Sequence, residues 1–124
     1  MAFERTGLQH RLGIVRDGDE AVKYLSGEGI YTNRTVHPLP DAVLLDLSIP
    51  GRNGHQVLQW IRTQPNLKKL PVVVLTGSFN TADYRNAMSE GATSYHLKPE
   101  NAAGLQTILT EVSRKWLSSS GSLP

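Results

Sequence analysis

The sequence predicts an α/β domain built on a doubly wound parallel sheet with helices on both faces. Short runs of apolar, mostly β-branched residues recur along the chain without alternating with polar residues, which is typical of strands covered on both sides. Segments with helical spacing separate these runs, as in βαβ units. The length of 124 residues corresponds to one domain.

The predicted strands are short. The clearest runs are Ala-Val-Leu-Leu at 42–45 and Val-Val-Val-Leu at 72–75, and weaker runs lie at 12–15 and 93–97. Each has the length expected of a strand in a parallel sheet, and turn-forming residues lie beside each run.

Helices are predicted at 19–25, 54–64, 80–90 and 101–117. The third begins at a cap-like Asn80, with Asp83 three residues later, and ends at Gly91. The fourth has its apolar residues at helical spacing. The segment 26–40 is rich in Gly, Asn and Pro and is predicted to be a surface loop. We therefore expect one domain over 1–117 and a flexible Ser-rich tail over 118–124.

The composition excludes several classes of protein. Because the chain has no cysteine, it has no disulfide scaffold, thiolate metal site or cysteine nucleophile. The formal net charge of +2 and the lack of a basic cluster do not favour nucleic-acid binding. No apolar run approaches the roughly 18 residues that a membrane span needs, and no signal-peptide core is found. We therefore expect a cytoplasmic domain that binds neither nucleic acids nor membranes.

A carboxylate, a hydroxyl and an ammonium stand directly at the ends of three predicted strands. Asp46 follows 43–45, Thr76 follows 72–75 and Lys98 follows 95–97. Because ligand sites of open α/β sheets lie at the carboxyl ends of the strands, we expect these side chains to converge. They suit phosphoryl chemistry as nucleophile, hydrogen-bond donor and cation. Each residue alone would be an ordinary turn or surface residue, so the prediction depends on their coincidence.

Three segments at these strand ends carry a family resemblance. Residues 41–54 (DAVLLDLSIPGRNG), 71–77 (PVVVLTG) and 91–99 (GATSYHLKP) resemble the receiver domain of two-component response regulators. The resemblance runs from about residue 12 to 117. The turn at 16–18, the loop at 26–40 and the Ser-rich end are most similar to single-domain receivers that partner bacterial and cyanobacterial phytochromes. The resemblance implies a flavodoxin-like receiver fold.

The resemblance also implies roles for the site residues. Asp46 would be the phosphoacceptor, receiving a phosphoryl group from a partner histidine kinase. Asp46 and the backbone carbonyl of Ser48 would bind Mg²⁺. Thr76 would move toward the phosphoryl group and Lys98 would pair with it.

Two further residues would form a switch in this family. Tyr95 would rotate inward as a buried aromatic residue, and Pro99 would follow a cis peptide bond that positions Lys98. Gly77 stands where the family usually has another small residue. Because its hydrogen side chain blocks nothing, we expect water to reach the phosphoryl group easily and the phosphorylated state to be short-lived.

The chain departs from the family at its N-terminal end. Receivers begin with a central strand that ends in an adjacent acidic pair, which holds Mg²⁺. Residues 2–10 instead resemble the last turns of the first helix, and none of the early acids (Glu4, Asp17, Asp19 and Glu20) is expected at a suitable strand end. Because Asp46 would be the only carboxylate at the site, we expect weak Mg²⁺ binding and slow phosphorylation by small donors.

Loss of a central strand would be costly. Each buried, unpaired backbone group costs about 1–3 kcal/mol, and a whole domain is stable by only about 5–15 kcal/mol. Three resolutions stay open. The functional protein begins further upstream, which we favour; or the 12–15 strand moves into the gap to give a four-stranded sheet; or a second copy contributes a strand or covers the exposed face in a homodimer.

Two other functions are compatible with the sequence. A pseudo-receiver of the same fold would act as a scaffold or interaction module and would never be phosphorylated. An aspartate-nucleophile phosphatase would need a second acid two residues after the nucleophile, where this chain has Ser48. We therefore expect a signalling protein and not an enzyme.

Overall fold

The computed structural model describes residues 2–5, 11–47, 51, 53–77, 80–112 and 114–115. Its centre is a five-stranded sheet in the order β1-β2-β3-β4-β5. The strands are β1 (Ala2–Arg5), β2 (Arg11–Val15), β3 (Ala42–Asp46), β4 (Val72–Thr76) and β5 (Ser94–Leu97). β2 to β5 are parallel and β1 is antiparallel to β2. The predicted parallel sheet is confirmed.

Four helices cover this sheet in the described part of the chain: α1 (Gly18–Ser26), α2 (Gly54–Thr63), α3 (Thr81–Ser89) and α4 (Ala102–Val112). Short 3₁₀ turns lie at η1 (Gly29–Tyr31) and η2 (Pro65–Leu67). The predicted cap is confirmed, because Asn80 Oδ1 accepts hydrogen bonds from the backbone of Ala82 and Asp83. No helix among these residues is both long and apolar enough to cross a membrane.

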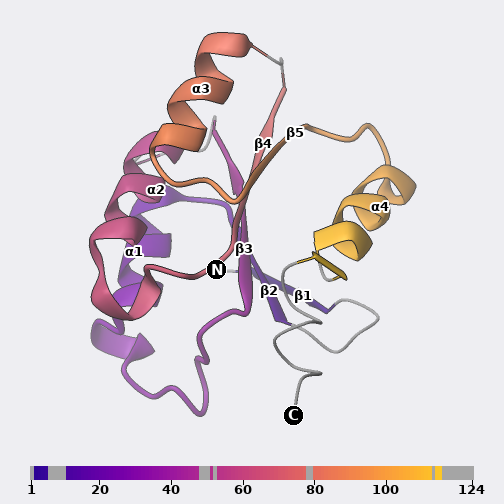
Figure 1. The fold of residues 1–124 in the computed structure, drawn as a ribbon. Helices are drawn as coiled ribbons and strands as arrows, with labels where there is room; N and C mark the ends of the chain where they lie inside the picture. The colour runs from indigo at the N-terminus through magenta and orange to yellow at the C-terminus, as the bar shows by residue number, and fades with distance from the viewer. Residues whose placement is uncertain are drawn as a thin grey trace.

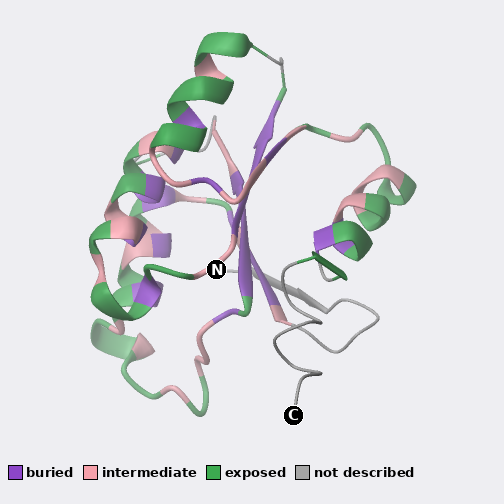
Figure 2. Ribbon diagram, viewed as in Figure 1, coloured by how far each residue is buried: buried purple, intermediate pink, exposed green. Residues whose placement is uncertain are grey.

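The helices lie on both faces of the sheet, with α1, α2 and α3 on one face and α4 on the other (Figure 1). Alternate residues of β3 serve the two faces. Val43 and Leu45 pack with α1, α2 and α3, whereas Ala42 and Leu44 pack with α4. Figure 2 shows the buried residues gathered along the strands and on the helix sides that face them. The sheet is therefore covered on both faces, as the continuous apolar runs predict.

β2 occupies the central gap that the family resemblance left open. Leu12 pairs with Ala42 and Val15 with Leu45, so β2 lies directly beside β3. This is the second of the three resolutions. From β2 to β5, each strand is added on the same side of the strand that precedes it in the sequence. Right-handed crossovers between these strands therefore place α1, α2 and α3 on the same face of the sheet.

Residues 2–5 correct the sequence-based interpretation. They form β1, and not the end of a helix, and the rest of the 2–10 segment lies outside the described residues. With β2 beside β3, the other edge of β2 would present unpaired backbone groups. β1 pairs with that edge, with Ala2 opposite Ile14 and Arg5 opposite Arg11.

Arg62 ties together the loops at the amino end of the sheet. Its Nε donates to the carbonyl oxygen of Gly91 at 2.8 Å, and its Nη1 donates to the carbonyl oxygens of Leu70 at 2.7 Å, Lys68 at 3.1 Å and Leu67 at 3.2 Å. Burial lowers the pKa of its guanidinium. One side chain from α2 thus fixes the chain before both β4 and β5.

Arg34 has a similar role in the loop after α1. Its guanidinium donates to the carbonyl oxygens of Tyr24 at 2.8 Å, Leu25 at 2.9 Å and His37 at 3.2 Å. The hydroxyl of Tyr24 donates to the carbonyl oxygen of Pro38 at 2.8 Å. The predicted surface loop is therefore held to the C-terminal end of α1 by several bonds.

Candidate functional site

Three neighbouring strands end together at the carboxyl edge of the sheet. Asp46 is the last residue of β3 and pairs with Leu75, while Thr76 is the last residue of β4 and pairs with Leu97. Lys98 follows β5 directly. Parallel pairing therefore delivers these three residues to one edge, because the apolar runs before them have matching lengths.

A carboxylate and an ammonium meet directly at this edge. The Nζ of Lys98 lies 2.6 Å from Oδ2 of Asp46, although the two residues are 52 positions apart in the sequence. The side chain of Asp46 is 20% exposed and that of Lys98 is 55% exposed. Solvent and a partner can therefore reach the pair, and the lysine balances the charge of the carboxylate.

Thr76 lies beside this pair at the level of the backbone. Its carbonyl oxygen accepts a hydrogen bond from the backbone N–H of Lys98 at 2.6 Å. The residue itself is buried, with 7% exposure. The next residue, Gly77, is exposed, and a Cβ added there would have no heavy atom within 4 Å. The edge next to Thr76 is thus open, as the small residue predicts.

Tyr95 lies in the core near the end of β5. It is 8% exposed and belongs to the cluster formed with α2 and α3. Its ring packs edge-on against Tyr84 of α3, with centroids 5.5 Å apart and planes at 84°. The aromatic ring therefore has the inward position, and its role as a switch stays a prediction.

Pro99 corrects one expectation. No cis peptide bond occurs among the described residues, so the bond from Lys98 to Pro99 is trans. The trans form of such a bond is favoured by about 0.5–1 kcal/mol unless the surroundings impose the cis form. Here the backbone of Lys98 is held by its bond to Thr76.

Two early acids come closer to this edge than the sequence suggested. Because β2 lies beside β3, Asp17 and Asp19 follow a strand next to the one that ends at Asp46. A Cβ built on Gly51, in the loop after β3, would lie 3.0 Å from Oδ1 of Asp17 and 2.9 Å from Oδ2 of Asp19. The strand order thus brings these two carboxylates to the edge of the sheet that carries Asp46.

These carboxylates do not form a complete metal site with Asp46. Within the described ranges, no group of three His, Cys, Asp or Glu side chains is arranged to hold a metal ion. Oδ1 of Asp17 accepts the hydrogen bond from the backbone of Glu20 that caps α1. Ser48, whose carbonyl was the other predicted ligand, lies outside the described residues.

His55 connects α2 and α3, a link that no sequence motif indicates. Its Nδ1 lies 2.5 Å from Oε1 of Glu90, at the end of α3, and Gln59 donates to Oε2 of the same carboxylate at 2.9 Å. The partners are 35 and 31 positions apart, so no local motif marks them. They fix α3 against α2.

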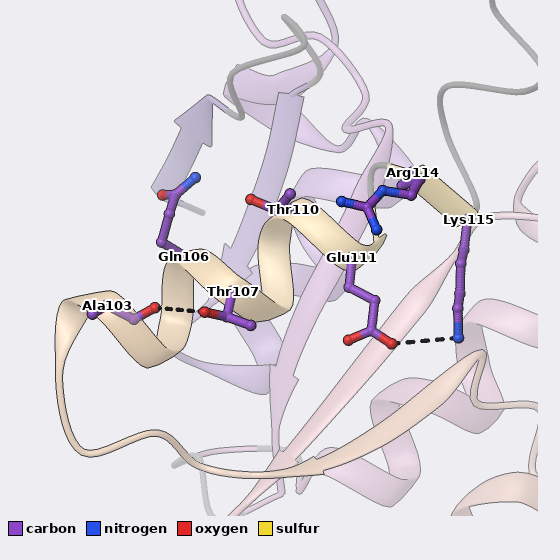
Figure 3. A pocket seen from close by; sticks show the side chains of 7 residues that line it. All are labelled: Ala103, Gln106, Thr107, Thr110, Glu111, Arg114 and Lys115. Carbon is purple, nitrogen blue, oxygen red and sulfur yellow. Dashed lines mark hydrogen bonds and ion pairs between the residues drawn. The ribbon is translucent and has the colours of Figure 1, made fainter.

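A cavity of about 540 Å³ lies elsewhere, along the outer face of α4 (Figure 3). Its described walls come from this helix and the residues that follow it: Ala103, Gln106, Thr107, Thr110, Glu111, Arg114 and Lys115. None of the three strand-end residues lines it. This cavity therefore lies apart from the three strand-end residues.

The sequence matches the model of the response regulator receiver domain over residues 2–110. The chain belongs to the receiver domain family. This receiver domain is 40% identical over 119 residues to the probable methanogenesis regulatory protein FilR2 of Methanothrix harundinacea, covering 94% of the chain and 72% of FilR2. It is 36% identical over 110 residues to the response regulator Rcp1 of Synechocystis, covering 89% of the chain and 73% of Rcp1.

Solved receiver structures agree with this assignment. The phosphorylated cyanobacterial phytochrome response regulator RcpA superposes with a TM-score of 0.78 at 37% identity, covering 93% of this chain and 80% of RcpA. The Mn²⁺-bound form of Rcp1 superposes with a TM-score of 0.70 at 34% identity, covering 85% of this chain and 73% of Rcp1. The domain is therefore a flavodoxin-like receiver homologous to phytochrome response regulators, as its motifs suggested, and its family acts in two-component signalling.

Proposed function

We propose that this receiver accepts a phosphoryl group on Asp46 from a partner histidine kinase. The observation that carries the proposal is the ion pair between Asp46 and Lys98, 2.6 Å apart at the ends of two parallel strands. An aspartate paired in this way with a neighbouring ammonium has its carboxylate oriented for attack, as a nucleophile requires.

The transfer uses the three strand-end residues. A carboxylate oxygen of Asp46 attacks the phosphorus of a phosphohistidine, forming an O–P bond while the N–P bond breaks and its electron pair returns to the imidazole. The ammonium of Lys98 offsets the negative charge on the phosphoryl oxygens. The hydroxyl of Thr76 is at the next strand end, where rotation about its χ1 angle would let it donate to one of these oxygens.

Related receivers bind divalent cations: Rcp1 has been solved with Mn²⁺, and the receiver domain of the kinase PA1611 with magnesium in its active-site cleft. The described carboxylates of this chain do not fit such an ion well, because they form no three-residue ligand group and Asp46 already faces an ammonium. We therefore propose weak Mg²⁺ binding and, as a consequence, slow phosphorylation by small donors.

The partner would be a histidine kinase of the phytochrome type, as the likeness to RcpA and Rcp1 supports. The signal would pass on through protein contacts in the cytoplasm, and a homodimer stays a prediction. A hydrolase is disfavoured because Ser48 stands where a phosphatase needs its general acid.

Phosphorylation with ³²P-labelled acetyl phosphate tests the proposal. The full chain, Asp46→Asn and Asp41→Asn are incubated for several hours, and label is measured after gel electrophoresis. Asp41 is a matched control because it lies at the other end of β3, where its Oδ2 accepts from the backbone of Arg11 at 2.6 Å. We expect label on the wild type and on Asp41→Asn, and none on Asp46→Asn.

A second candidate, the pseudo-receiver, is favoured by the incomplete set of metal ligands. It predicts that no variant is labelled, even by a phosphorylated kinase. The same experiment with and without Mg²⁺ tests the metal proposal separately. We expect a change below about threefold, since the described carboxylates form no three-residue ligand group; strong Mg²⁺ dependence would contradict that point alone.

A further inference from the structure

Gly104, in the first turn of α4, lies unusually close to Pro99. A Cβ added to Gly104 would be 2.9 Å from the Cβ of Pro99, closer than two such atoms approach in ordinary packing. Pro99 directly follows Lys98, whose Nζ pairs with Asp46. The first turn of α4 therefore packs against the residue next to the site lysine.

Hydrogen bonds to Asn101 stabilise this first turn of α4. Oδ1 of Asn101 accepts from the backbone N–H of Gly104 at 2.9 Å, and the carbonyl oxygen of Asn101 accepts from Leu105 at 3.2 Å. Helix propensity alone would favour alanine over glycine at such a position. The close contact with Pro99 gives a reason for glycine, because any side chain would have to displace the proline ring.

Lys98 is thus held from both sides along the backbone. On one side its N–H donates to the carbonyl oxygen of Thr76 at 2.6 Å. On the other side the proline ring restricts the backbone of the residue before it and has a fixed φ of its own. When the ring is fixed by α4, the direction in which the Lys98 side chain leaves the strand is fixed as well.

We propose that Gly104 is a positioning residue for Lys98. By allowing α4 to pack directly on Pro99, it keeps the ammonium of Lys98 at the carboxylate of Asp46. The inference deepens the proposed phosphoryl transfer and rests on it for its functional consequence, while its structural part concerns the ion pair alone.

Gly104→Ala in the full chain tests the inference with two readouts. The first is the nuclear magnetic resonance signals of the Lys98 amide and side-chain ammonium, and the second is the rate of labelling by acetyl phosphate. We expect both Lys98 signals to shift and labelling to slow about tenfold, since small misplacements of reacting groups have large kinetic effects. Ala103→Gly is the control, because Ala103 lines the outer groove of the same helix (Figure 3).

The control changes helix propensity by a similar amount in the opposite direction, at a residue that lines the outer face of α4. We expect its labelling to stay within about twofold of wild type. Rescue gives the second test. In a Pro99→Gly background, which removes the opposing Cβ, adding Gly104→Ala is expected to change neither readout.

Unchanged Lys98 signals in Gly104→Ala, or an equal effect of Gly104→Ala in the Pro99→Gly background, would overturn the inference. An unlabelled wild type would instead count against the proposed function, and the Lys98 signals would still decide the positioning role.

Discussion

The two ends of the sheet are built in opposite ways. At the amino end, Arg62 and Arg34 donate hydrogen bonds to backbone carbonyl oxygens of the loops and of the last turn of α1, and the hydroxyl of Tyr24 adds another. At the carboxyl end, the described contacts of Asp46 and Lys98 centre on one ion pair, with the lysine 55% exposed. Gly77 leaves open space beside it.

This difference between the two ends means that the contacts important for stability and those important for function lie in different places. Backbone carbonyl oxygens are permanent partners, so the arginine bonds fix the loops in one arrangement. An exposed ion pair contributes little to the free energy of unfolding and can exchange its partner for an incoming anion. The arginine bonds that fix the loops therefore lie at the opposite end of the sheet from the edge where a charge must arrive and leave.

The largest effect is expected on the free energy of unfolding, from removing the hydrogen bonds of Arg62 at the amino end of the sheet. Arg62→Met should lower the free energy of unfolding by about 2–4 kcal/mol, because it removes charged hydrogen bonds to partly buried carbonyl oxygens. Labelling of the folded protein should stay unchanged. Chemical denaturation measures the first quantity, with the exposed Lys69→Met as control. A loss below about 0.5 kcal/mol would show that Arg62 does not hold this end together.

Lys98→Met should have the reverse pattern. Loss of the ammonium is expected to slow labelling of Asp46 by about 10²-fold, while the free energy of unfolding changes by less than about 1 kcal/mol. Lys115→Met removes another exposed ion pair, with Glu111 at 3.3 Å, and serves as control. Equal labelling of the two variants would argue against a role for Lys98 in transfer.

Gly77 offers a graded test of the open edge. The Cβ of Gly77→Ala would lie in open space, and Gly77→Val adds two further carbons at the same exposed position, so the fold should tolerate both. We expect the phosphorylated state to last about twofold and fivefold longer, since water reaches the phosphoryl group less easily. Loss of label is followed over time after removal of the donor. Loss over many hours already in the wild type would contradict the expected short lifetime.

Tyr24 gives the smallest effect, at the amino end. Burial raises the pKa of its phenol, so folding favours the neutral form. A raised pKa in the folded state means that this stabilisation is complete below the ordinary tyrosine value of about 10 and is lost as the pH rises through the folded value. Denaturation between pH 8 and 11 should therefore show a smaller decline in Tyr24→Phe than in wild type. If the free energy of unfolding of the two proteins declined equally with pH, Tyr24 would make no contribution to the pH dependence.

Local sequence patterns predicted most of the elements and the placement of the site residues. The apolar runs correctly predicted β2 to β5. Because the strands end where these runs end, the runs also predicted that Asp46 and Thr76 lie at the ends of β3 and β4 and that Lys98 directly follows β5. Spacing alone could not give the position of β2. Which strands become neighbours depends on every other strand that competes for the same edge.

Other features have no local signature. The partners of Arg62 are backbone carbonyl oxygens, which every residue carries, so no side-chain pattern marks them. The trans bond at Pro99 differs from the cis form by an energy too small to be inferred from residue types. The contact between Gly104 and Pro99 depends on the path of the chain between β5 and α4.

The order of the strands has a consequence for how the chain folds. Each parallel strand lies beside the one that precedes it in the sequence, so the sheet can grow by adding strands at one edge. No strand has to insert between two that have already paired, although each parallel pairing joins residues 21 to 30 positions apart. Because such non-local pairings form slowly, refolding from denaturant should begin within neighbouring βαβ units and then spread along the sheet.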